Sequence, residues 1–229
     1  MHPADKTARV AGVLYLLMGA PAVFSLMYVP NKLVVPGNAD ATANNVTGSE
    51  TLFRLGIAAE LAAAVFLLLL VLALHRLLSH VDRNHARLMV GMVLVSVAIS
   101  FTNVLNSIAA VTLFRVTDYL SALDKPHRDA LGMLFLALHR QGIGVVGIFW
   151  GLWLFPFGVL VMRSGLPRLL GVLLILNCVG YVAASLTTLL LPSYANIVSR
   201  VVMPTLLGEL WIMLWLLIRG ARMQPSGAA

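Results

Sequence analysis

Apolar and polar residues fall in long alternating blocks along this chain. Six blocks approach the roughly 20 consecutive apolar residues that cross a bilayer as a helix. They cover residues 10–29, 55–78, 88–114, 143–162, 169–191 and 201–218. Because each apolar run is continuous and does not alternate with polar residues, the pattern predicts spanning helices and argues against a membrane β-barrel. The expected fold is an all-α bundle of six transmembrane helices, forming a single membrane domain over residues 1–229.

Composition agrees with this class of fold. Hydrophobic residues make up 60% of the chain and charged residues 11%, whereas soluble domains are about 25% charged. The net charge is +7, and its distribution predicts that both termini are cytoplasmic, because the connections that would then lie inside are strongly basic. That bias argues against a nucleic-acid partner. The inner segments contain Lys6, Arg9, Arg76, Arg83, Arg87, Arg163, Arg168, Arg219 and Arg222 against Asp5 and Asp82.

The first apolar block has a rival interpretation as a cleaved signal peptide. It is long for the apolar part of such a peptide, and its removal would leave five spans, so we interpret it as the first span. The single cysteine, Cys178, lies inside an apolar block, which excludes an internal disulfide and a thiolate metal cluster.

Local signals predict where some helices begin and bend. Asp124 followed by Pro126 predicts a helix start, and Pro156 predicts a kink in the fourth span. The apolar residues between 126 and 140 recur at helical spacing, so this stretch either extends the fourth span or lies in the membrane interface.

Two opposite charges lead into the second apolar block, Arg54 and Glu60. A charge within a span costs about 2.5 to 3.5 kcal/mol on insertion scales, so such residues usually face other helices and find partners there. Arg54 and Glu60 are six residues apart in the chain and do not share a helical face. They therefore need not bond each other directly. Arg54 has two candidate counter-ions, Glu60 and Glu209.

Other polar residues interrupt the apolar blocks at a similar depth. Asn103 and Asn106 are three apart and share a helical face, where they either bond a neighbouring helix or line a pocket. A polar stripe in the fifth span contains Asn177, Tyr181 and Ser185. We predict an outward-facing ligand-binding polar cluster composed of Arg54, Glu60, Asn103, Asn106, His139 and Glu209.

Several segments together resemble a known family. They are Leu52-Phe53-Arg54-Leu55-Gly56 with the acid Glu60, then Leu138-His139, then the turn Arg163-Ser164-Gly165-Leu166-Pro167-Arg168, and finally Gly208-Glu209-Leu210 with Leu214-Trp215-Leu216-Leu217. This set resembles the bacterial domain-of-unknown-function family DUF4386 over nearly the whole chain. The resemblance implies a multi-pass protein of the bacterial cytoplasmic (inner) membrane, and it implies no activity.

Three kinds of function remain open. The preferred hypothesis is a module that binds or translocates a small polar molecule or a proton, because acid and histidine pairs in spans are typical of proton relays. An intramembrane enzyme is less favoured: Glu60, His139 and Glu209 could in principle hold zinc, but no HExxH or GxSxG motif is present. A structural role, in which buried charges only fix helix packing, is the third. We predict no metal and no cofactor, and the lipid bilayer as the main partner.

Overall fold

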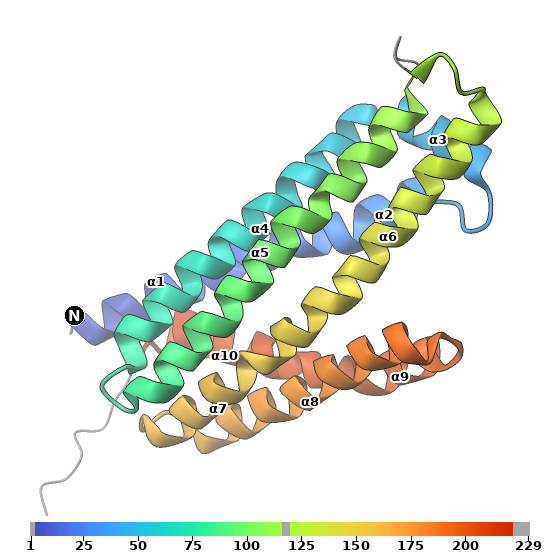
Figure 1. The fold of residues 1–229 in the computed structure, drawn as a ribbon. Coiled ribbons are helices and arrows are strands. Elements are labelled where there is room, and N and C mark those ends of the chain that lie inside the picture. The colour runs from blue at the N-terminus through green and yellow to red at the C-terminus, as the bar shows by residue number, and fades with distance from the viewer. Residues whose placement is uncertain (1–2, 116–119, 222–229) are drawn as a thin grey trace, which may run out of the picture. The chain divides into compact units, whose positions relative to one another are not determined.

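The computed structural model describes residues 3–115 and 120–221, and within them helices and turns occur without any β-strand. Arg222, which entered the charge argument above, lies outside the described residues. Figure 1 shows the helices in chain order. Their bounds are α1 Pro3–Val23, η1 Phe24–Tyr28, α2 Val29–Leu33, α3 Ala39–Gly48, α4 Glu50–Leu78, α5 Arg83–Phe114, α6 Lys125–Leu152, α7 Leu154–Arg163, α8 Arg168–Leu190, η3 Pro192–Tyr194, α9 Ala195–Val202, η4 Met203–Leu206 and α10 Leu207–Ile218.

Six helical stretches are long and apolar enough to cross a membrane, which confirms the predicted fold class. Each overlaps one predicted apolar block and extends beyond it at one end or both. The fourth shows the largest extension, because α6 is continuous from Lys125 to Leu152. Residues 126–140 therefore belong to the same helix as the fourth span. The stretches are Ala4–Leu33, Glu50–Leu78, Arg83–Phe114, Lys125–Arg163, Arg168–Leu190 and Pro192–Ile218.

The start of α6 is fixed by a side-chain cap. The backbone N–H of His127 donates to Oδ1 of Asp124 over 3.0 Å, so the carboxylate satisfies one of the free donors of the first helical turn. That bond, together with the one from the His127 ring, lowers the pKa of Asp124. The helix start predicted from Asp124 and Pro126 is confirmed.

Prolines divide two of the candidate spans into shorter helices. Pro156 has no N–H to donate to the carbonyl of Leu152, four residues earlier. α6 ends at Leu152 and α7 begins at Leu154. A helix break thus lies where Pro156 predicts a kink. In the last span, Pro204 lies within η4, a short 3₁₀ segment that separates α9 from α10.

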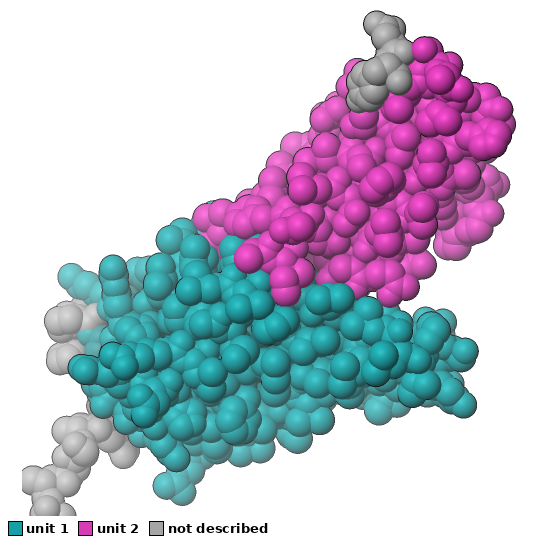
Figure 2. Space-filling model, viewed as in Figure 1, with its two compact units in different colours: residues 1–17, 66–97, 144–229 teal, residues 18–65, 98–143 magenta. Residues whose placement is uncertain are grey.

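The chain divides into two compact units, coloured separately in Figure 2. Unit 1 contains residues 1–17, 66–97 and 144–229, and unit 2 contains residues 18–65 and 98–143. The helices α1, α4, α5 and α6 each contribute residues to both units. We describe each unit by itself.

Unit 2 is built on an apolar core at which α2, α3 and parts of α4, α5 meet. Residues 30–49 lie between the first two apolar blocks and are more polar than either, yet they contain α3 and most of α2. The turn between these helices needs Gly37, whose φ is +75°, and Asn38 then caps α3 by accepting from the N–H of Ala41 over 2.9 Å. The core residues are Val29, Leu33, Ala43, Val46, Phe53, Ala110, Val111 and Phe114.

Unit 1 contains a tight hairpin of α7 and α8, visible at the lower edge of Figure 1. The two helices approach closely at Gly158 and Gly171: a Cβ at Gly158 would lie 2.7 Å from the Gly171 carbonyl oxygen. Small residues at such contacts allow spanning helices to pack backbone against backbone. Next to the hairpin, the Trp153 ring stacks on Phe157 with centroids 5.4 Å apart.

Candidate functional site

Unit 2 brings together a carboxylate and an imidazole, each from a candidate span. Oε2 of Glu60, on α4, lies 3.4 Å from Nε2 of His139, on α6, and the two side chains are only 11% and 17% exposed. We call this pair, together with Asn103 and Asn106 from α5, the Glu60–His139 centre. Nothing else among the described residues forms an ion pair with either member of the pair.

Asn103 determines how the His139 ring is presented. Its side-chain amide donates to the backbone carbonyl of His139 over 2.9 Å, and the same nitrogen lies 3.1 Å from His139 Nδ1. The backbone oxygen of Asn103 also lies 3.3 Å from Nδ1, so Asn103 offers this nitrogen a donor in one tautomer and an acceptor in the other. Nε2, the other ring nitrogen, faces the Glu60 carboxylate at 3.4 Å.

Two further residues hold Asn103 in place. Asn106 donates to Oδ1 of Asn103 over 3.2 Å, so the oxygen of that amide is occupied and its nitrogen faces α6. Gly142, one turn along α6 from His139, leaves the space that the Asn103 amide fills, since a Cβ there would overlap it. The centre therefore depends on a glycine that is not polar and was not among the predicted site residues.

The two carboxylate oxygens of Glu60 differ in environment. Oε2 faces His139, while Oε1 is buried and has no hydrogen-bond partner among the described residues. A buried carboxylate oxygen without a donor is costly when charged, and the cost falls if the group takes up a proton or receives a donor from a ligand. No three His, Cys, Asp or Glu side chains in the described part of the chain are grouped so that they could hold a metal ion.

Arg54 does not join this centre, and the expectation that Glu60 or Glu209 is its counter-ion was wrong. Its Nε donates to Oε1 of Glu50 over 2.6 Å, one turn earlier on the same helix, and its side chain is 51% exposed. Arg115 shares that oxygen at 3.1 Å. The reason is local geometry: Glu50 and Arg54 are i and i+4 in the first turns of α4, where an acid is also favoured by the helix dipole.

Glu209 belongs to unit 1 and has a separate set of partners there. The Tyr15 hydroxyl donates to Oε2 over 2.7 Å, and the Asn177 amide donates to Oε1 over 2.8 Å. Thr205 in turn donates to Oδ1 of Asn177 over 3.1 Å. Tyr181 faces the same carboxylate. We call this set the Glu209 centre.

The break in the last span positions Glu209. It is the third residue of α10, directly after η4, so the helix dipole favours its negative charge. Gly208 lets this turn approach α8 closely, because a Cβ there would lie 2.8 Å from the Leu173 carbonyl oxygen. The polar stripe on the fifth span signalled Asn177 and Tyr181, whereas Tyr15 stood alone in its apolar block without any spacing signal.

The helices and these two polar centres define a multi-pass helical membrane protein whose class carries no assigned chemistry. The family model described as "Domain of unknown function (DUF4386)" matches residues 10–220. The chain belongs to this family. No curated protein and no solved structure matches it.

Proposed function

We propose that the Glu60–His139 centre binds a proton within the membrane, and that the protein couples this binding to the passage or sensing of a proton or small polar molecule. The observation that carries the proposal is the 3.4 Å approach of Glu60 Oε2 to His139 Nε2, beside a buried and unpartnered Oε1. Ionisable residues in spans are expensive, and their usual roles are proton relays and ion or substrate paths.

The centre has the chemistry for a shared proton. With both ring nitrogens protonated, the imidazolium directs Nε2–H towards the Glu60 carboxylate; if that proton moves to Glu60, the neutral ring keeps its Nδ1 proton and the Nε2 lone pair faces the carboxylic acid. Asn103 serves both states, because its backbone oxygen lies 3.3 Å from Nδ1 and accepts from Nδ1–H in each. The ring can therefore exchange protons without turning.

The setting of the centre is part of the same proposal. The basic inner segments favour both termini inside, and the family resemblance favours a bacterial cytoplasmic membrane. In that orientation Glu60 and His139 face the outer half of the bilayer, so a proton or small polar ligand would enter from outside.

The test is infrared difference spectroscopy of the full chain in lipid as the pH is changed. A carboxylic acid carbonyl band reports protonation of Glu60, and we expect Glu60→Gln to remove it. His139→Gln should shift its midpoint, because the imidazole is the only basic neighbour of Glu60 among the described residues. The matched control is Glu209→Gln, which removes the other carboxylate inside the predicted apolar blocks and should leave the His139-dependent band unchanged.

Two results would overturn the proposal. One is a band that persists in Glu60→Gln and disappears in Glu209→Gln. The other is a band whose midpoint is the same in the parent and in His139→Gln. Movement of protons is then measured in vesicles with a pH gradient, where Glu60→Gln should reduce the flux and Glu50→Gln, at the exposed ion pair with Arg54, should not.

A further inference from the structure

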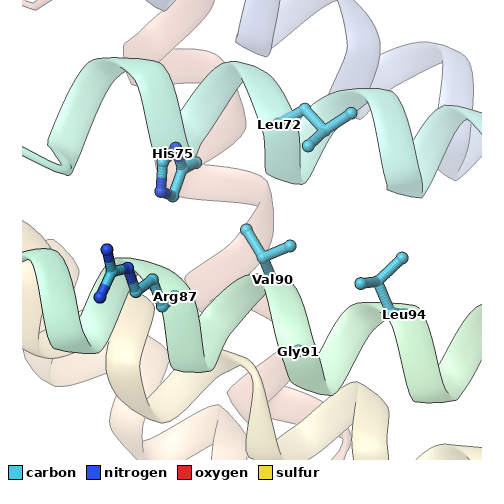
Figure 3. A pocket seen from close by; sticks show the side chains of 6 residues that line it. All are labelled: Leu72, His75, Arg87, Val90, Gly91 and Leu94. Carbon is cyan, nitrogen blue, oxygen red and sulfur yellow. The ribbon is translucent and has the colours of Figure 1, made fainter.

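A groove between α4 and α5 in unit 1 has a different character from either polar centre. It is open, has a volume of about 270 Å³, and is lined by Leu72 and His75 of α4 and by Arg87, Val90, Gly91 and Leu94 of α5. Figure 3 shows His75 and Arg87 at one end, towards the turn that joins the helices, with the apolar side chains along the rest. The groove is thus basic at one end and apolar elsewhere.

Gly91 opens the floor of this groove. No atom lies within 4 Å of the place where a Cβ on Gly91 would be, and the leucines beside it, Leu72 and Leu94, are 43% and 50% exposed. Pockets for whole small molecules usually measure about 300 to 1,000 Å³ and enclose most of the ligand. A smaller, open groove instead fits one segment of a longer molecule.

The two basic side chains at this end of the groove have no bonding partner among the described residues. Arg87 forms no ion pair or side-chain hydrogen bond with any described residue, and neither does the His75 ring. Two neighbouring basic groups do have a partner, since Arg163 and His85 lie 3.0 and 2.8 Å from Oδ2 of Asp82. Arg83 has no such partner among the described residues, but it does not line the groove. An unpaired guanidinium at the end of an apolar groove matches a phosphate joined to a hydrocarbon chain.

We propose that this groove binds an anionic phospholipid. One acyl chain lies along Leu72, Val90 and Leu94 over the space left by Gly91, and the headgroup phosphate accepts from Arg87 beside His75. A membrane protein is surrounded by phospholipid, so the ligand is abundant. The positive charge of Arg87 favours lipids with an anionic headgroup. The site is separate from the Glu60–His139 centre, whose residues all belong to unit 2.

The experiment measures how much lipid stays bound to the purified full chain. Native mass spectrometry in detergent compares phosphatidylglycerol with phosphatidylcholine of the same acyl chains, and we expect preferential retention of phosphatidylglycerol. Arg87→Gln should weaken that retention about fivefold, the effect of one basic residue near an anionic headgroup. Gly91→Leu should weaken binding of both lipids, because it fills the acyl groove while the open space leaves the fold intact.

Arg83→Gln is the matched control, since Arg83 is exposed at the same helix start but does not line the groove. Equal losses in Arg83→Gln and Arg87→Gln would overturn the proposal in favour of general surface charge. Undiminished binding in Gly91→Leu would also overturn it. Displacement of the lipid by inorganic phosphate alone would mean a phosphate site and not a lipid site. A dimer that forms in the parent and is lost in Gly91→Leu would mean that a second copy occupies the groove.

Discussion

Two carboxylates, Glu60 and Glu209, lie inside the apolar blocks predicted from the sequence, and their surroundings differ. Glu209 receives uncharged donors on both oxygens, from Tyr15 at 2.7 Å and from Asn177 at 2.8 Å. Glu60 has one oxygen at 3.4 Å from an imidazole and the other buried without a partner among the described residues. A carboxylate whose bonds are complete holds helices together, whereas an incompletely bonded one is free to take up a proton or a ligand.

The first prediction tests this contrast through stability. Glu209→Ala should lower the free energy of unfolding by about 2–4 kcal/mol, because it leaves the Tyr15 hydroxyl and the Asn177 amide unpaired and each costs about 1–3 kcal/mol. Glu60→Ala should cost about 1 kcal/mol or less, since it removes one long contact and relieves a buried oxygen of its unpaired state. Thermal unfolding in detergent measures both, and equal losses would remove the distinction between the centres.

The second prediction concerns the glycine beneath Asn103. Gly142→Ala places a Cβ where the Asn103 amide lies, so it should cost about 1–3 kcal/mol of stability through overpacking. It should also shift the titration of the Glu60–His139 centre, which Asn103 orients. Gly91→Ala is the control, because its added Cβ meets open space. If Gly142→Ala leaves both measurements unchanged, Asn103 does not orient His139.

The third prediction isolates one bond of the Glu209 centre. Tyr15→Phe keeps the ring, which lies 6.3 Å from that of Trp153, and removes only the hydroxyl donor. We expect a loss of about 1 kcal/mol in unfolding free energy. Tyr28→Phe is the control, since Tyr28 is 53% exposed and stacks on Phe24. A loss as large in the control would show that the assay responds to tyrosine removal in general.

The smallest effect is expected outside the spans, at Asp82. The backbone N–H of His85 bonds this carboxylate and lowers its pKa, with a further contribution from the His85 ring. In the unfolded chain an aspartate has a pKa of about 3.9, and in the folded protein the pKa of Asp82 is lower. The bonds to Asp82 therefore stabilise the fold fully above the unfolded value, and this stability is lost as the pH falls through the folded value. Asp82→Asn should therefore flatten the acid limb of the unfolding temperature against pH. An unchanged acid limb would show that the bonds to Asp82 contribute nothing to stability.

Much of the fold could be predicted from the sequence because it depends on properties carried by single segments. Continuous apolar runs define the candidate spans, and a proline at 156 interrupts a helix wherever that helix packs. The segment between residues 30 and 49 was harder: it reads as a connection because it is polar and contains a turn, yet Asn38 caps a helix that packs against the core of unit 2.

The candidate site was predictable only as a set of polar residues whose burial in a membrane costs free energy. Glu60, His139 and Asn103 are conspicuous because polar groups in apolar runs need partners, and the structure places them in one centre. Their partners depend on which helices meet, and this kept the assignment of Glu209 to Tyr15 out of reach. The pairing of Arg54 with Glu50 is a local i, i+4 contact within α4, and it was missed because only Glu60 and Glu209 were considered as counter-ions. Gly142 has no polar side chain, so nothing in the sequence indicated that it supports the site.

The bond between Tyr15 and Glu209 joins residues that are 194 positions apart in the sequence. A chain synthesised from its N-terminus therefore inserts α1, with the Tyr15 hydroxyl, long before α10 supplies the acceptor, and contacts of such separation form late in folding. The two glycines of the α7–α8 hairpin, by contrast, meet soon after synthesis. Closure of the Glu209 centre thus marks the completion of unit 1, and a ribosome stalled before residue 209 would expose an assembly intermediate in which Tyr15 and Asn177 await their acceptor.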